Sequence, residues 1–480
     1  MSNASTYDNY IAGSWVATQQ YTENINPSDT SDVVGQYAVG SVADVEQAVA
    51  AARGAQPGWA SAGIQQRSTI LATAARLMDA RAEELGDLLA REEGKQLTEA
   101  TAEVRRAVQI LEFFAAEALR NTGTAIESVR PGLTVEMTHE PVGVVGVITP
   151  WNFPIAIPVW KIAPALAFGN TVVFKPAGIT PGMAWEFVNI MDQAGLPAGV
   201  LNLVMGSGAV IGDALLAADI DAVSFTGSAG VGRSIAVQCV TRGIRVQCEM
   251  GGKNPLVILG DADLDQAVDH AISGSFYSTG QRCTASSRLI VPADVHDEFV
   301  AKMKARMDTL TVGDARAEGT VIGPVSSASQ LESNLEYVEI ARAEGGDVYG
   351  GQRVSGETEG YFMQPALVVG TTNDMRINRE EVFGPVASVI KVADYEEALA
   401  VANDTEFGLS AGICTQSLQK ASDFKRRSQA GMVMVNAPTA GVDPHVSFGG
   451  RKGSSYGARE QGAAAREFYT QHKTAYTNPG

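Results

Sequence analysis

The stretch GVVGVITPWNFPIAIPVWKIAPALAFGNTVVFKP, residues 143–176, holds two short apolar runs with a helical pattern between them. GVVGVITP (143–150) and TVVFKP (171–176) are rich in β-branched residues and predict two buried strands. The residues from Pro154 to about Phe168 predict the helix that joins them. Apolar strands that alternate with helices are typical of a parallel sheet with helices on both faces. The stretch therefore predicts an α/β fold.

The same alternation continues on the C-terminal side of this stretch. VLNLVMG (200–206) and AVSFTG (222–227) predict further strands, and a helix is expected from Gly230. This series is typical of a doubly wound, Rossmann-like nucleotide-binding domain. A second alternation predicts a separate α/β domain with these elements: strand NPLVILG (254–260), helix Leu264–Ser275, strand SSRLIVPA (286–293) and a helix from Val295.

The two ends of the chain predict elements outside this core alternation. Residues 1–40 predict turns and short strands, and apolar spacing then predicts helices over Val42–Arg53, Gln65–Lys95 and Glu103–Leu119. At the other end, EFYTQHKTAYT (467–477) alternates and predicts a strand that belongs to neither domain. A terminal strand of this kind often pairs with a neighbouring subunit.

The composition disfavours several classes of function. The chain has 480 residues, and 36 Lys and Arg against 54 Asp and Glu give a formal net charge of −18. This charge disfavours binding to nucleic acid or to an anionic membrane surface. The four cysteines and five histidines are scattered and predict neither a disulfide framework nor a metal site. We expect no signal peptide, no transmembrane helix and a cytoplasmic location.

Two motifs at strand ends are candidates for binding an anionic ligand. In FTGSAGVG (225–232), Gly227, Gly230 and Gly232 would let backbone amides approach an anion at a helix N-terminus. A glycine-rich turn without a ligand is the alternative. Lys175 in FKPAG ends a strand at the edge where open α/β sheets bind ligands, and a solvated lysine is the alternative there.

Further motifs carry side chains suited to catalysis. Asn152 lies between the two prolines of PWNFP and could donate to an oxyanion, and Glu249 in CEMGG could act as a general base. Cys283 in GQRCT lies beside Arg282, whose charge would lower the pKa of the thiol. EVFGP (381–385) pairs a carboxylate with a phenyl ring that could pack on a flat ligand. Taken singly, each motif is explained at least as well by a bland alternative: a packed turn, a surface carboxylate or a buried, inert thiol.

Taken together and in this order, PWNFP, FKPA, FTGS, EMGGKNP, GQRC and EVFGP strongly resemble the NAD(P)-dependent aldehyde dehydrogenase superfamily. The resemblance runs from about Tyr10 to the C-terminus. It implies small-molecule aldehyde substrates and a homodimer or homotetramer. It also implies a three-part subunit: a Rossmann-like cofactor domain in residues 1–122 and 142–253, an α/β catalytic domain in residues 254–450, and a small β oligomerisation element in residues 123–141 and 451–480.

The resemblance implies that an aldehyde is oxidised to a carboxylic acid through a covalent thioester. Cys283 matches the nucleophile that attacks the aldehyde carbon. Asn152, together with the backbone N–H of Cys283, matches the group that binds the oxyanion. Hydride transfer to the nicotinamide leaves a thioester on Cys283, and Glu249 would activate the water that hydrolyses it.

The resemblance also assigns residues to the cofactor and the substrate. Lys175 matches the residue at the adenosine ribose, Ser228 lies on the pyrophosphate, and Glu381 lies on the nicotinamide ribose. Trp151 and Phe383 line the cofactor cleft, and the remaining cofactor positions are Ile148, Gly178, Gly227 and Gly232. The expected walls of the substrate tunnel are Phe153, Ile157, Trp160 and Phe448.

Two positions depart from the common family pattern. Many NAD-preferring members carry Glu three residues after the FKPA lysine, where this chain has Gly178. Without that carboxylate, NADP is expected to be accepted and preferred, with NAD as the alternative. Arg282 stands where many members have a small or apolar residue. It is expected to bind a substrate carboxylate, or else to pack on the protein or lower the pKa of Cys283.

The closing stretch GVDPHVSFGGRKGSSYGAREQGAAAREFYTQHKTAYT (441–477) and GQRCT are most similar to the branch of 2,5-dioxopentanoate (α-ketoglutaric semialdehyde) dehydrogenases. A carboxylated semialdehyde is therefore the expected substrate. The alternatives are succinic semialdehyde or an aromatic aldehyde, and a CoA-acylating enzyme, against which Glu249 argues. From another class, a catalytically silent binding or structural protein is the alternative, and the intact Cys283, Asn152 and Glu249 argue against it.

Overall fold

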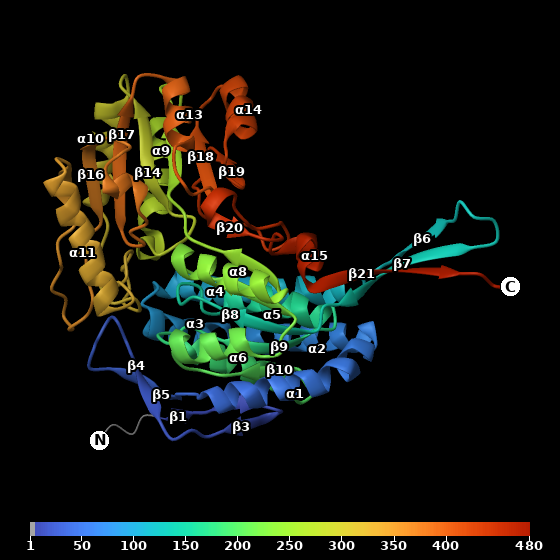
Figure 1. The fold of residues 1–480 in the computed structure, drawn as a ribbon. Coiled ribbons are helices and arrows are strands. Elements are labelled where there is room, and N and C mark those ends of the chain that lie inside the picture. Colours follow the sequence, from blue (N-terminus) through green and yellow to red (C-terminus); the bar gives the residue numbers. More distant parts are fainter. Residues whose placement is uncertain (1–4) are drawn as a thin grey trace.

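The computed structural model describes residues 5–480 and has three parts (Figure 1). The lower part, blue to green, is built on an eight-stranded sheet, and the upper left part, yellow to orange, on a seven-stranded one. A three-stranded arm extends to the right and contains the C-terminal strand. Across residues 5–480, no helix has both the length and the apolar character needed to cross a membrane. A further small sheet consists of β1 (Thr6–Tyr7), β5 (Val33–Ala38) and β4 (Tyr21–Ile25).

The first sheet confirms the doubly wound pattern. Its central strands are parallel in the order β12-β11-β8-β9-β10, and β20, β2 and β3 add antiparallel edges. The strand order therefore reverses between β8 and β11, and open α/β sheets bind ligands at such a reversal. The strands are β2 (Asn9–Ile11), β3 (Ser14–Val16), β8 (Val144–Ile148), β9 (Thr171–Lys175), β10 (Leu201–Leu203), β11 (Ala222–Thr226), β12 (Arg245–Glu249) and β20 (Ser455–Tyr456).

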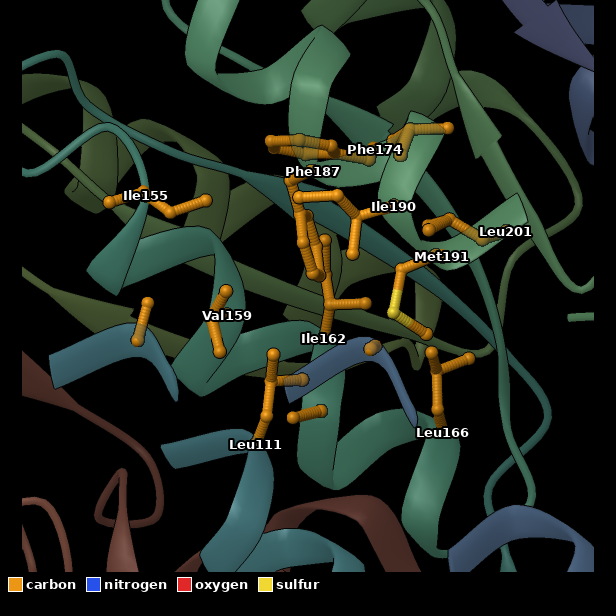
Figure 2. Close-up of a cluster of buried hydrophobic side chains, with 14 of the residues drawn as sticks. Leu111, Ile155, Val159, Ile162, Leu166, Phe174, Phe187, Ile190, Met191 and Leu201 are labelled. Atoms are coloured by element: carbon orange, nitrogen blue, oxygen red, sulfur yellow. The ribbon is translucent and has the colours of Figure 1, made fainter. Parts of the chain in front are cut away.

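Helices cover both faces of this sheet, and α5 (Ala156–Ala167) is buried at every residue. Figure 2 shows Val159, Ile162 and Leu166 of α5 in one apolar cluster with Phe174 of β9 and Phe187 of α6. A helix that is apolar all round is typical of such an inner layer. The other helices are α1 (Val42–Ser61), α2 (Ile64–Asp79), α3 (Ala82–Glu93), α4 (Leu97–Ala118), α6 (Pro181–Gln193), α7 (Asp213–Ala217), α8 (Ala229–Arg242) and the π-helical turn η1 (Gly208–Gly212).

The single helix predicted over residues 65–95 is two helices in the structure. Between α2 and α3, Arg81 leaves helical geometry with φ −114° and ψ 17°. Its guanidinium pairs with Glu84 and with Glu186 of α6, and these contacts hold the bend. Apolar spacing continues on both sides of Arg81, so periodicity alone does not reveal the break.

The second part also has the predicted α/β pattern. Its sheet has the order β15-β16-β17-β14-β13-β18-β19, and only β15 is antiparallel to its neighbour. The amino ends of β13, β14 and β17 therefore share one edge. The strands are β13 (Asn254–Ile258), β14 (Ser286–Pro292), β15 (Asp347–Gly350), β16 (Ala366–Thr371), β17 (Val386–Val392), β18 (Ser410–Cys414) and β19 (Met432–Val435). The helices are α9 (Leu264–Phe276), the 3₁₀ turn η2 (Tyr277–Gly280), α10 (His296–Met307), α11 (Ala328–Ala343), α12 (Arg376–Arg379), α13 (Tyr395–Asn403) and α14 (Leu418–Arg427).

The C-terminal segment is divided differently from the prediction. β21 (Thr470–Thr477) pairs with β7 (Thr134–Pro141) of its own chain, and β7 pairs with β6 (Thr124–Glu127). The strand predicted from residue 467 begins at Thr470, because α15 (Ala465–Tyr469) precedes it. Of the element predicted over 451–480, only β21 lies in the arm. β20 joins the first sheet, and α15 contacts α5 of the first part. The segment also contains two short 3₁₀ turns, η3 (Lys452–Ser454) and η4 (Gly462–Ala464).

A buried ion pair anchors this segment to the first part. Lys161 of α5 pairs with Glu460, and their side chains are 0% and 2% exposed. Glu460 also accepts a hydrogen bond from Trp160 Nε1 at 2.7 Å, and Lys161 Nζ donates to Ser224 of β11 at 3.0 Å. Because water is excluded, each charge depends on the other for its stability.

Lys161→Met is expected to destabilise the folded protein by about 3–5 kcal/mol, because the Glu460 carboxylate then stays buried without its cation. Guanidinium unfolding measures this change. Lys473→Met is the matched control: it removes the exposed partner of Glu140 in the arm and should cost about 0–1 kcal/mol. Equal unfolding midpoints for the two variants would contradict the anchoring role of Lys161.

Candidate active site

The predicted catalytic motifs meet where the two sheets face one another. Glu249 is the last residue of β12 and Asn254 the first of β13, so residues 250–253 join the carboxyl edge of the first sheet to the amino edge of the second. Cys283 precedes β14 and Glu381 precedes β17, at that same amino edge. The topology therefore brings both loops beside the linker.

Glycines allow these segments to approach closely. The Glu381 carboxylate lies against Gly251, where a Cβ would come 2.0 Å from Oε2, and Gly252 N donates to Oε1 at 2.8 Å. A Cβ at Gly280 would lie 2.1 Å from the carbonyl oxygen of Gly384, and Gly280 has a φ of +66°. A side chain at Gly280 is thus opposed by sterics and by backbone conformation.

The turn before Cys283 has an uncommon backbone. Ser278 and Thr279 both occupy the left-handed region, with φ of 52° and 54°. Such residues cost about 1–3 kcal/mol each and persist only when their surroundings hold them. Glu99 of α4 accepts from Ser278 N at 2.9 Å and from its Oγ at 3.2 Å. On the other side, Asn254 donates to the carbonyl of Cys283 at 2.7 Å, so both ends of the turn are fixed.

Asn152 reaches the junction from the first part of the molecule. Its buried side-chain amide donates to the carbonyl of Gln281 at 2.9 Å. The backbone carbonyl of Asn152 accepts a hydrogen bond from Lys95 Nζ at 2.6 Å, and Lys95 forms an ion pair with Glu103 at 2.5 Å. Glu103 also accepts from the backbone N–H groups of residues 155 and 156, at the start of α5. A buried ion pair therefore positions the Asn152 loop.

Cys283 is a neutral thiol in this environment. Burial, followed by the charges of Glu381 and Glu249, raises its pKa to about 12, and the backbone N–H groups of Cys283 and Thr284 act in the opposite direction. The net shift of this pKa is upward, opposite to the lowering expected from the charge of Arg282. The thiolate needed for attack has to arise with the help of a base or a ligand.

Glu249 is a buried carboxyl group with one oxygen engaged. Ser455 Oγ of β20 donates to Oε2 at 2.5 Å, and Oε1 is buried without a hydrogen-bond partner among residues 5–480. Burial, followed by the charge of Glu460, raises the pKa of Glu249 well above its usual value, and the hydrogen bond from Ser455 lowers it. A carboxylate of raised pKa is the stronger base, which suits general-base catalysis.

The predicted cofactor residues surround the strand-order reversal of the first sheet. Ile148 ends β8, and Gly227 and Ser228 follow β11 on the other side of the reversal. Ser228 is the N-cap of α8 but makes no side-chain capping bond. Lys175 ends the neighbouring strand β9, its Nζ donates to Pro176 O at 2.9 Å, and burial lowers its pKa to about 8. A buried ammonium with a single partner among the described residues favours a polar or anionic ligand.

The glycines of this crevice have different physical roles. Gly178 is exposed, and a Cβ there would meet no atom within 4 Å, so the missing carboxylate leaves open space. Gly227 lies against the Phe225 ring and Gly232 against Met250 Sδ, each 2.6 Å from an added Cβ. At these two positions the packing of the protein itself excludes a side chain.

Trp151 and Phe383 lie together beside Glu381. Their rings meet edge to face, with centroids 5.4 Å apart and an interplanar angle of 87°. Phe383 has a φ of 58°, a strained conformation that turns this loop. Burial raises the pKa of Glu381 to about 7, against the hydrogen bond from Gly252 and the charge of Lys253. The arrangement joins an aromatic wall to a buried carboxyl group.

A cavity of about 770 Å³ reaches Cys283. Phe153, Trp160 and Phe448 line it, and the rings of Trp160 and Phe448 are 5.4 Å apart. Ile157 does not belong to its lining among the described residues. It is 1% exposed and packs in the apolar core of the first part, so the structure corrects its assignment to the tunnel wall.

Comparison with known proteins identifies this arrangement. Residues 15–475 match the model of the Aldehyde dehydrogenase family. The chain belongs to the aldehyde dehydrogenase family. It is 44% identical over 481 residues to an alpha-ketoglutaric semialdehyde dehydrogenase of Bacillus subtilis, with 99% of each chain covered. It is 45% identical to an alpha-ketoglutarate semialdehyde dehydrogenase of Haloferax volcanii, with 98% of each covered. Among solved structures, a betaine aldehyde dehydrogenase from Staphylococcus aureus in complex with NAD+ is similar, with a TM-score of 0.96 and 32% sequence identity. The match covers 99% of this chain and 95% of the S. aureus chain.

In this aldehyde dehydrogenase, Arg282 is held by the protein. It lines the cavity, but its Nη2 donates to the backbone carbonyls of Ser273 and Gly274 at the end of α9, the latter at 3.1 Å. Its Nε is buried without a partner among residues 5–480. Of the three roles expected from the sequence, packing on the protein therefore has direct support, and carboxylate binding by Arg282 stays a prediction.

Two residues of the site were missed in the sequence. Ser455 holds Glu249, but it lies in β20, which has two residues and gives no periodic signal. Arg106 of α4 lines the cavity. α4 also carries Glu99, Glu103, Arg105 and Glu112, so no signal in the sequence singles out Arg106.

Ser455→Ala is expected to move the acidic limb of the pH–rate profile to higher pH by about one unit. The hydrogen bond from Ser455 lowers the pKa of Glu249, so its loss raises that pKa. A general base works only when deprotonated, so activity should fall most at low pH and recover as the pH rises.

The pH dependence of kcat measures this shift. Ser454→Ala is the control, because Ser454 is a buried neighbour whose hydroxyl accepts from Gly408 N. A loss of activity by Ser455→Ala that is equal at every pH would mean that Ser455 only supports packing.

Proposed function

We propose that this chain oxidises an aldehyde with a remote carboxylate, such as 2,5-dioxopentanoate, to the corresponding acid, with NAD(P)+ as the oxidant. The observation that carries the proposal is the meeting of Cys283, Asn152 and Glu249 at the junction reached by the cavity. Two relatives named as α-ketoglutarate-type semialdehyde dehydrogenases, each matched over nearly the whole chain, support the substrate class.

In the first step, Cys283 Sγ forms a bond to the aldehyde carbon. The Asn152 amide carries two N–H groups, and one of them donates to Gln281 O. The second, with the backbone N–H of Cys283, is assigned to the oxyanion. Since the pKa of the thiol is about 12, its proton has to pass to a base other than Glu249, such as water in the cavity, as the bond to carbon forms.

When bound, a nicotinamide dinucleotide supplies the hydride acceptor. Lys175, Ser228 and Glu381 are the residues that would hold it. Within residues 5–480 the Lys175 ammonium has one hydrogen-bond partner, and its open donors fit this role. Oxidation at the bound carbon leaves an acyl thioester on Cys283. Glu249 then takes a proton from water, the water oxygen attacks the acyl carbon, and the Cys283 sulfur leaves.

Cys283→Ala should abolish aldehyde oxidation and keep dinucleotide binding, because the thiol supplies the covalent bond but does not hold the cofactor. Absorbance of NAD(P)H measures the first and fluorescence titration the second. Glu249→Gln should form one equivalent of NAD(P)H rapidly and then turn over slowly, because the thioester accumulates. Comparable turnover by Cys283→Ala would reject the mechanism, and loss of the burst in Glu249→Gln would place Glu249 in the attack step.

We propose that NADP+ is accepted and preferred over NAD+. The support is local: a carboxylate at position 178 would face the ribose 2′-oxygen, and Gly178 leaves that space open. Lys175 is the nearby cation, and a bound phosphate would stabilise its charged form against burial.

Gly178→Glu should shift the ratio of kcat/KM for NADP+ and NAD+ toward NAD+ by about tenfold or more, because a carboxylate repels the 2′-phosphate. Open space at position 178 should keep the fold intact. Gly178→Gln is the matched control, since it has the same size without the charge. A wild-type enzyme that uses NAD+ far better than NADP+ would reject the proposal.

We also propose that the chain forms a homo-oligomer, a dimer or tetramer. β21 is an exposed edge strand of the arm, and the exposed face of α8 carries Val231, Val237 and Val240. Unpaired edges and apolar surface of this kind are typical of subunit contacts. Light scattering tests the proposal, and a monomer at micromolar concentration would reject it.

A further inference from the structure

One cation of the cavity wall has no partner among residues 5–480 of the protein. The other three cations are engaged: Lys95 with Glu103, Arg105 with Glu83, and Arg282 with two backbone carbonyls. Arg106 lines the same cavity and forms no hydrogen bond or ion pair with any described residue of the chain. An arginine carries five N–H donors, so a large hydrogen-bonding capacity is left open.

The anions of the wall do not fill this gap. Glu83 pairs with Arg105, Glu103 with Lys95 and the start of α5, and Glu99 accepts from Ser278. Asp443 is the remaining carboxylate, and within residues 5–480 it has no ion pair or hydrogen bond through its side chain. Asp443 is exposed, so water satisfies it at little cost.

Arg106 differs from Asp443 in its exposure to solvent, because the arginine is half-buried. Burial lowers the pKa of Arg106, and the charges of Glu103 and Asp443 act in the opposite direction. A cation that is partly removed from water and unpaired is costly, and it gains most from an anion that enters with its own pair of acceptors. The guanidinium fork matches a carboxylate in this way.

We propose that Arg106 binds the remote carboxylate of the substrate and so selects carboxylated aldehydes over neutral ones. This inference rests on the proposed function and assigns its specificity to a residue of α4. The aldehyde end reaches Cys283 past Phe153, Trp160 and Phe448, and the carboxylate end meets Arg106 in the wall of the same cavity. Arg282 then supports the turn before Cys283 and does not contact the carboxylate.

The first test compares 5-oxopentanoate with its methyl ester, which has the same chain but no charge. Arg106→Met should lower kcat/KM for the anion about 10- to 100-fold, the range of a charged hydrogen bond, and change that for the ester less than about threefold. Arg106→Lys should recover part of the loss. Arg120→Met is the matched control, because it removes the same charge from an exposed arginine just after α4 that does not line the cavity, and it should leave the preference intact.

Equal losses for the anion and the ester would overturn the assignment and make Arg106 a structural residue. An unchanged preference in Arg106→Met, or an equal effect of Arg120→Met, would also overturn it. A wild-type enzyme without a preference for the anion would reject the proposed substrate class itself, so the two failures are distinguishable.

A second test needs no aldehyde. Alkylation of Cys283 by iodoacetate and by iodoacetamide, corrected with Cys283→Ala, reports whether the cavity attracts an anion. Arg106→Met should lower the ratio of the two rates about tenfold, through the loss of iodoacetate reactivity. An unchanged ratio would show that Arg106 does not act on anions in the cavity and would overturn the inference.

Discussion

The site depends on the close backbone contact between residues 250–253 and the loops that carry Cys283 and Glu381. The apolar cores of the two sheets are largely separate, although Ala315 of the second part packs in the core of the first. At Gly251 and Gly280, a Cβ would lie 2.0 and 2.1 Å from the facing atoms. Glycine there lets the sheets meet, and the meeting places Asn152 from one part beside the Gln281 carbonyl of the other.

Buried ion pairs then position the walls of the cavity. Lys95 and Glu103 hold the loop of Asn152, and Lys161 and Glu460 hold Trp160 through its indole N–H. Such pairs add little net stability, because desolvation offsets most of their attraction. Their effect is on geometry. Each buried charged group has only one arrangement that satisfies its hydrogen bonds, so the side chains and backbone groups bonded to it are held in one position. Strain at Ser278 and Thr279 is maintained by similar contacts.

The electrostatics of the site follow from the same burial. Burial raises the pKa values of the Glu249 and Glu381 carboxyl groups, and burial, followed by the charges of these two groups, raises the pKa of the Cys283 thiol. The junction therefore holds three groups that all resist ionisation. A proton can pass between two of these groups without changing the net charge of the buried site. The pKa values of the groups respond strongly to any ligand that brings charge or removes water.

The sequence by itself determined the α/β alternation, because buried strands and amphipathic helices each need their own spacing of apolar residues. The order of the motifs also indicated the family, and the resemblance to that family assigned the nucleophile to Cys283 and the general base to Glu249. Only the tertiary structure decided the bend at Arg81 and the pairing of β20 with β12, which depend on contacts distant in sequence. The same holds for Arg105 and Arg106: a helix turns about 100° per residue, so adjacent arginines face different surroundings, and only the packed fold shows which one is left unpaired.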